Sequence, residues 1–248
     1  MYYEIHGSGF PLVLIHGGGS TLGTTFGRIL PTLARTHRVI AVELQAHGHT
    51  ADIDRPLSFQ HDADDVAALL RELHVEKADI FGFSNGASTT LEMAIRHPHL
   101  VNRIVVASTF HKTDGAYPWL WESMRHAKFD DMPQPYKDAY LQINPDPAAL
   151  HMMFSRDVAR MRSFPDIRDE DIRAIEAPAL IVAGDSDVVK PEHAVEMFRM
   201  MRHASLAIFP GGHGDYMGEL TTLKPGKHEY PVLPIIEEFL TETTKRGA

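Results

Sequence analysis

One serine of the chain stands in a setting that favours nucleophilic chemistry. Residues 82–86 read Gly-Phe-Ser-Asn-Gly, a G-x-S-x-G motif that follows an apolar run and precedes a helix-like stretch at residues 87–96. Glycines two positions before and after the serine permit a sharp strand-to-helix turn, because a Cβ at either position would clash with the neighbouring strand or helix. We expect this turn to expose the Oγ of Ser84. The alternative is a plain turn with a capping serine.

A glycine-rich stretch is a candidate for the second part of an acyl-transfer site. Residues 16–19 read His-Gly-Gly-Gly and end the first apolar run of the chain. Loops of this kind supply an oxyanion-hole N–H in lipases and esterases, since glycine lets the backbone approach a substrate oxygen. We predict that the N–H groups of Gly18 and Asn85 form the oxyanion hole. The alternative is a flexible turn in which His16 satisfies hydrogen bonds near the strand end.

Two further loops offer an acid and a base. Residues 184–187 read Gly-Asp-Ser-Asp after one apolar run, and residues 211–214 read Gly-Gly-His-Gly after the last one. Ser84, Asp187 and His213 then follow one another in the chain order nucleophile, acid, base, each at the end of its own run. We predict that His213 accepts the proton of Ser84 and that Asp187 orients the imidazole. Asp185 lies in the turn itself, where an Asp side chain commonly bonds backbone N–H groups.

The composition excludes several classes of partner. The 248 residues carry 24 basic and 33 acidic side chains, a formal net charge of -9, and no run of Lys or Arg that would neutralise a nucleic-acid backbone. The absence of Cys rules out disulfides, thiolate metal sites and a cysteine nucleophile. The first residues show no leader pattern and no segment reaches 18 apolar residues, so we expect a cytoplasmic protein without a membrane segment.

The elements that must hold these loops are buried strands that alternate with helices. Residues 63–73 place apolar side chains on one helical face, and similar segments separate most of the apolar runs. This alternation predicts an α/β fold with a mostly parallel twisted sheet, helices on both faces and ligand sites beyond the carboxyl ends of the strands. The predicted strands are residues 11–15, 38–42, 78–81, 103–107, 179–183 and 205–209.

One interval breaks the alternation. Residues 110–172 contain no clear buried strand but many aromatic, Met and Pro residues, within what we expect to be a single domain over residues 1–248. We interpret the interval as a small helical cap over the sheet edge, and we predict that Trp119, Trp121 and Met153 bind substrate. The alternative is a set of ordinary helices that pack their own core.

Taken together, these stretches resemble the α/β-hydrolase superfamily, in the region of esterases, haloperoxidases and C–C hydrolases. The resemblance spans nearly the whole chain and includes residues 3–9 and the Ala-His-Gly-His-Thr stretch at 46–50, in which we take His47 as structural. It implies an eight-stranded sheet whose antiparallel second strand is supplied by residues 2–6, with the usual first strand missing or very short. The predicted mechanism of Ser84, His213 and Asp187 requires neither a metal nor an organic cofactor.

The leading functional hypothesis is hydrolysis of a small, fairly apolar carboxylic ester by a serine hydrolase. C–C bond hydrolysis is an alternative, although Gly19 is followed by Ser20 and Thr21 where enzymes of that kind usually have Pro-Gly. Perhydrolysis, haloperoxidase activity and a slow-turnover ligand receptor remain open. We expect a small-molecule partner and a monomer or homodimer.

Overall fold

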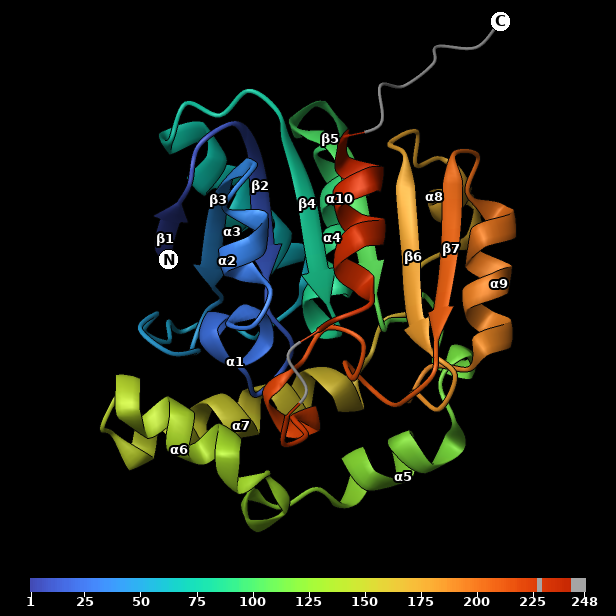
Figure 1. Cartoon of the computed structure of the whole chain (residues 1–248). Helices are drawn as coiled ribbons and strands as arrows, with labels where there is room; N and C mark the ends of the chain where they lie inside the picture. Colours follow the sequence, from blue (N-terminus) through green and yellow to red (C-terminus); the bar gives the residue numbers. More distant parts are fainter. Residues whose placement is uncertain (227–228, 242–248) are drawn as a thin grey trace, which may run out of the picture.

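In the computed structural model, which describes residues 1–226 and 229–241, a twisted sheet forms the centre of the molecule (Figure 1). The described residues form seven strands in the order β1-β3-β2-β4-β5-β6-β7. Only β1 runs antiparallel to its neighbour, β3, as the resemblance implied for residues 2–6. The strands are β1 (Tyr2–His6), β2 (Phe10–Ile15), β3 (His37–Glu43), β4 (Ala78–Phe83), β5 (Val101–Ala107), β6 (Ala179–Gly184) and β7 (Ala204–Phe209).

Helices cover both faces of this sheet, which confirms the α/β class. Because side chains alternate along a strand, Val13 and Ile15 of β2 pack in one core cluster while Leu12 and Leu14 pack in the other. The first face carries α3 (Phe59–Glu72), α4 (Asn85–Arg96), α8 (Asp169–Arg173) and α9 (Pro191–Met200), and the second carries α1 (Leu22–Phe26), α2 (Leu30–Leu33) and α10 (Val232–Thr241).

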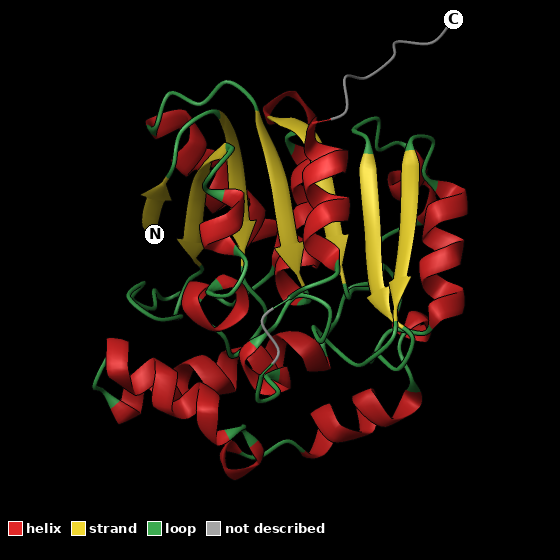
Figure 2. Cartoon of the chain, viewed as in Figure 1, coloured by secondary structure: helices red, strands yellow, loops and turns green. Residues whose placement is uncertain are grey.

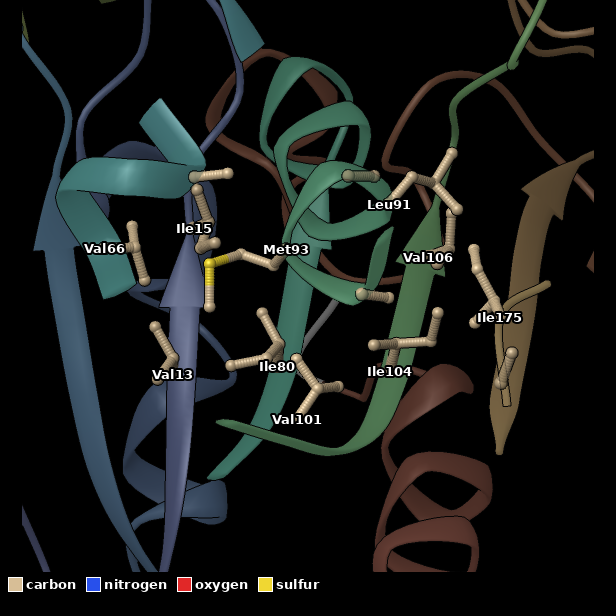
Figure 3. Packing of buried hydrophobic residues seen from close by; sticks show 14 of the residues in the cluster. Val13, Ile15, Val66, Ile80, Leu91, Met93, Val101, Ile104, Val106 and Ile175 are labelled. Carbon is tan, nitrogen blue, oxygen red and sulfur yellow. The ribbon is translucent and has the colours of Figure 1, made fainter. Parts of the chain in front are cut away.

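The core on the first face is a continuous apolar layer. Figure 3 shows the side chain of Met93, on α4, extending toward Ile15 and Ile80 of two neighbouring strands. All three side chains are fully buried. Such a layer fixes the ends of the strands relative to one another, because close-packed interiors resist small displacements.

A cap covers the carboxyl ends of the strands (Figure 2). It consists of α5 (Pro118–His126), α6 (Gln134–Ile143) and α7 (Pro147–Arg162), all between β5 and β6 in the chain. Each of these helices has a proline in its first two positions, where the missing N–H removes no hydrogen bond. Short 3₁₀ turns lie at Pro98–Leu100, Thr113–Gly115, Phe129–Asp131 and Leu220–Thr222.

The end of the predicted cap is corrected by the structure. Ile167 and Ile172 pack in the core cluster of the first sheet face, so α8 belongs to the sheet layer although it falls within residues 110–172. Among the described residues, none of the helices has both the length and the apolar character that crossing a bilayer requires.

The turn between β4 and α4 generates a stability prediction. A Cβ on Gly86 would lie 2.1 Å from the carbonyl oxygen of Ile15, whereas a Cβ on Gly23, in α1, would come no closer than 3.9 Å to Thr21 Oγ1. We expect Gly86→Ala to lower the free energy of unfolding by about 3 kcal/mol or more. Gly23→Ala should leave it unchanged or raise it by about 0.5–1 kcal/mol. Urea unfolding followed by circular dichroism measures both, and equal stability of the two variants would contradict the close approach.

Candidate active site

Ser84 lies at the turn that joins β4 to α4. Its backbone adopts φ 55° and ψ -122°, a conformation that costs a non-glycine residue energy and that the surrounding structure must enforce. The enforcement comes from close packing: a Cβ on Gly82 would lie 2.1 Å from the Gly86 carbonyl oxygen, and one on Gly17 would lie 3.3 Å from Ser84 Cβ. The turn therefore presents the Ser84 hydroxyl to the cavity beneath the cap.

The structure brings together the side chains of Ser84, His213 and Asp187, which sequence analysis predicted to act as one unit. The Nε2 atom of His213 lies 3.0 Å from Ser84 Oγ, and its Nδ1 lies 2.6 Å from Asp187 Oδ1. Since Nδ1 donates to the carboxylate, Nε2 of the neutral ring is an acceptor and the Ser84 hydroxyl donates to it. This arrangement permits proton transfer from Ser84 to His213.

Asp187 is fixed by several donors. Its Oδ1 also accepts the N–H of Val188 at 2.6 Å, and its Oδ2 accepts the N–H of Gly184 at 3.2 Å and the hydroxyl of Ser108. Because the Ser108 hydroxyl donates to the carboxylate, the Tyr216 hydroxyl, 2.6 Å away, must donate to Ser108. Burial by itself raises the pKa of Asp187, but His213 and these donors hold it below its ordinary value.

The electrostatics of His213 favour its charged form. Burial by itself lowers the pKa of the imidazole, yet the carboxylate of Asp187, with a smaller contribution from Glu219, raises it above the ordinary value. The neutral form needed to accept a proton is therefore lost as the pH falls through this raised pKa. The ring of Phe83 lies beneath the imidazole, with ring centroids 4.7 Å apart.

Asp185 bonds neighbouring loop residues, as its place in the turn predicted. Its Oδ1 accepts the N–H of Gly211 at 3.0 Å and the hydroxyl of Ser186 at 3.0 Å, whereas the carboxylate bonded to His213 is that of Asp187. These bonds connect the loop after β6 to the loop that carries His213. Asp185 shapes the loops, whereas Asp187 contacts the imidazole.

The two predicted oxyanion donors face the same cavity as Ser84. In the part of the chain that the structure describes, the backbone N–H groups of Gly18 and Asn85 have no protein acceptor. A Cβ on Gly18 would lie 2.3 Å from Asn85 Nδ2, so the glycine loop packs directly on the turn after Ser84. N–H groups that are left free beside Ser84 are available to an anionic oxygen.

A cavity of about 610 Å³ extends from Ser84 to the cap. Residues of α5 and α7 line it with helical spacing, because side chains three and four positions apart share a face. One face of each helix therefore lines the cavity, and the other faces contact solvent or pack against neighbouring elements. The cap residues of the cavity wall are Leu120, Ser123, Met124, His126, Ala127, Asp131, Met132, Pro133, Tyr136, Phe154, Asp157, Val158 and Met161.

The three side chains predicted to bind substrate lie outside this wall, which corrects the prediction. Trp119 is 53% exposed on the outer side of α5, and Trp121 packs behind the wall against Phe110 while its Nε1 donates to the Thr113 carbonyl oxygen. Met153 is fully buried in the small core between α6 and α7. Each is the sequence neighbour of a cavity-lining residue, Leu120 or Phe154, and therefore lies on a different face of its helix.

Several residues of the site were missed by sequence analysis. Tyr136, on α6 of the cap, donates a hydrogen bond of 2.8 Å to Glu219, which lies beyond His213 in the chain. Ser108 directly follows β5, a position where its type could have drawn attention. Tyr216 and Asp157 carry no comparable signal in the sequence.

Comparison with known proteins gives the same architecture. A model of the alpha/beta hydrolase family matches residues 12–220. The chain is 29% identical over 231 residues to 2-hydroxy-6-oxo-2,4-heptadienoate hydrolase of Pseudomonas putida, covering 82% of each chain. It is 37% identical over 106 residues to 2-hydroxymuconate semialdehyde hydrolase of a Pseudomonas species, covering 40% of this chain but only 36% of that protein.

The structure of a serine hydrolase involved in carbazole degradation is also similar. It superposes with a TM-score of 0.76, covers 96% of this chain and 93% of its own, and shares 24% sequence identity. A likeness at this level of identity establishes the fold.

The geometry separates the two neighbouring acids by a measurable effect. Asp187→Asn should lower kcat for an ester substrate by about 10⁴, because an amide offers the wrong hydrogen-bond partner to the imidazole. Asp185→Asn keeps an acceptor for the Gly211 N–H and should cost less than about tenfold. Steady-state kinetics on both variants, with circular dichroism to confirm folding, give the comparison. A larger loss of kcat in Asp185→Asn would show that Asp187 is not the acid that supports His213.

Proposed function

The chain belongs to the α/β hydrolase family, and from this premise we propose that it is a serine hydrolase that cleaves small, fairly apolar carboxylic esters through an acyl-enzyme. The observation that carries the proposal is the hydrogen-bonded chain from Asp187 through His213 to Ser84, in which Ser84 and His213 line a largely apolar cavity. The relatives support hydrolysis in general, and the ester substrate is inferred from the cavity.

The reaction proceeds in two steps. In the first, Ser84 Oγ attacks the ester carbonyl carbon as its proton passes to His213 Nε2, and the resulting imidazolium then protonates the departing alcohol. The N–H groups of Gly18 and Asn85 bind the oxyanion, and each donor of this kind contributes about 3 kcal/mol to transition-state stabilisation. In the second step, a water molecule activated by His213 releases the acid and restores Ser84.

The charge of the cavity wall favours a neutral acyl group. Among the described residues, no Lys or Arg lines the cavity, while the carboxylates of Asp131 and Asp157 do. His126 is exposed and pairs with Glu122 at 2.9 Å, and His213 is needed as the base. An anionic substrate would lose its hydration here without gaining a cation, which is unfavourable. Aliphatic and aromatic side chains such as Leu120, Met124 and Phe154 suit an apolar acyl chain.

C–C bond hydrolysis is the second candidate, and it rests on the relatives. The relative that is matched over 82% of its length acts, by its name, on a heptadienoate, which is a carboxylate. The negative charge of such a substrate must be compensated by a cation or by hydrogen-bond donors. Among the described residues, no Lys or Arg in the cavity wall provides that cation. The same Ser84 and His213 geometry would serve either reaction, so the charge of the preferred substrate distinguishes the two.

A matched pair of esters tests the proposal. p-Nitrophenyl pentanoate and mono-p-nitrophenyl glutarate have acyl chains of equal length, which end in a methyl group and a carboxylate respectively. We expect kcat/KM to be about 100-fold higher for the pentanoate, because burying an uncompensated carboxylate costs about 3 kcal/mol. The chain should turn over many equivalents of the pentanoate, whereas a slow-turnover receptor would stop after one.

The control is Ser84→Ala, which should hydrolyse neither ester above the background rate. Equal values for the two esters, or a preference for the glutarate, would contradict the neutral acyl site and would favour the C–C hydrolase candidate.

A further inference from the structure

Asp157, on cap helix α7, reaches the glycine loop of the sheet. Its Oδ2 accepts the backbone N–H of Gly19 at 2.5 Å, across 138 positions of sequence. The same oxygen accepts a hydrogen bond of 2.8 Å from His47 Nε2, and Oδ1 accepts one from Arg160. Asp157 lines the cavity, and 10% of its side chain is exposed.

The hydrogen bonds of His47 determine its charge. Its Nδ1 faces the carbonyl oxygen of Gln45 at 2.8 Å, and its Nε2 faces the carboxylate of Asp157. A carbonyl oxygen only accepts, and so does an ionised carboxylate, so both ring nitrogens must carry a proton. The fully buried His47 is therefore an imidazolium. Burial alone lowers its pKa, but Asp157 raises it above the ordinary value despite the opposing charge of Arg160.

The neighbouring His16 is in the opposite state. Its Nδ1 donates to the Gly17 carbonyl oxygen at 2.7 Å, while its Nε2 accepts the N–H of Leu44 at 3.1 Å, which requires a neutral ring. Burial, together with the charge of His47, lowers the pKa of His16 to about 3. The rings of the two histidines lie 4.9 Å apart, and of the two only His47 is charged.

Two cations and two carboxylates balance one another behind this loop. Arg160 Nη1 bonds Asp62 Oδ2, on α3, at 2.7 Å, and Arg160 also contacts Asp157. Both side chains of the Arg160–Asp62 pair are almost fully buried. Removing one member of such a network leaves an uncompensated charge in the interior, which is strongly unfavourable. Asp157 is thereby held ionised, with its Oδ2 directed at Gly19.

From these contacts we propose that Asp157 is a positioning residue, which aligns the N–H of Gly18 for the oxyanion by fixing the Gly19 peptide, so that the oxyanion hole is complete only when α7 is seated on the sheet. Gly19 has φ 64°, a conformation that its lack of a Cβ permits and that does not by itself define one orientation of the loop. The carboxylate supplies the missing restraint. This inference rests on the proposed function, because it assumes that an oxyanion forms at Ser84.

Three single variants test the role of Asp157. Asp157→Ala removes the acceptor of the Gly19 N–H and should lower kcat for p-nitrophenyl pentanoate by about 10²-fold, the usual loss for one oxyanion donor, while KM changes little. Asp157→Asn keeps an oxygen that can accept this N–H and should recover at least about tenfold of the loss. Asp62→Asn breaks the other side of the Arg160 network without touching the loop, so it should lower the melting temperature but leave kcat within about threefold of the wild type.

A second pair of variants serves if Asp157→Ala fails to fold. The double variant Asp62→Asn/Arg160→Met removes one carboxylate and the guanidinium, and it keeps Asp157 with His47 and Gly19. Adding Asp157→Leu removes the last carboxylate. His47 then loses its proton from Nε2, because Asp157 held it charged, and its Nδ1 still donates to the Gln45 carbonyl oxygen, so no unpaired charge remains. The triple variant should have about 10²-fold lower kcat than the double variant at similar stability.

The rate of labelling by a fluorophosphonate probe separates this inference from the proposed function. A wild type that is labelled but hydrolyses no ester would refute the ester proposal, and the labelling rates of the same variants would still test Asp157. The positioning role is overturned if Asp157→Ala loses no more kcat or labelling rate than Asp62→Asn. It is also overturned if Asp157→Asn is as impaired as Asp157→Ala.

Discussion

The strained turn at Ser84 is the constraint on which the rest of the site depends. A φ of 55° at a serine persists only because β4, α4 and the end of β2 pack around it at backbone contact distance. Gly86 lies against the carbonyl oxygens of Ile15 and His16, so the same packing brings the glycine loop beside the serine. One close approach thus places both the Ser84 hydroxyl and the N–H groups of Gly18 and Asn85 at the same cavity.

The other groups reach this turn from the carboxyl ends of neighbouring strands. Ser108 follows β5, Asp187 follows β6 and His213 follows β7, and parallel strands place all three at one edge of the sheet. The cap then contacts two of the loops that line the cavity: Tyr136 bonds Glu219 near His213, and Asp157 bonds Gly19. The cap therefore forms one wall of the cavity and also bonds the loops that border it.

The sequence was sufficient to predict those parts of the fold and site that depend on a local pattern of residues. Apolar runs separated by helical periodicity predicted the strands, and glycine spacing predicted the turn at Ser84 and the loops of Asp187 and His213, because each depends on a few adjacent residues. The cap was harder. Trp119, Trp121 and Met153 were chosen by residue type, yet the cavity face of α5 and α7 is set by how these helices dock on the sheet. Asp157 was missed because its partners, Gly19 and His47, are more than a hundred residues away.

The central claim is that Ser84 is a nucleophile activated by His213, and peptide mass analysis after reaction with a fluorophosphonate probe tests it most directly. Ser88 and Ser108 also line the cavity and serve as internal controls. The account predicts a single phosphonylated peptide that contains Ser84, full labelling of Ser88→Ala, and no labelling of Ser84→Ala. Modification at Ser88 or Ser108, or undiminished labelling of Ser84→Ala, would contradict it.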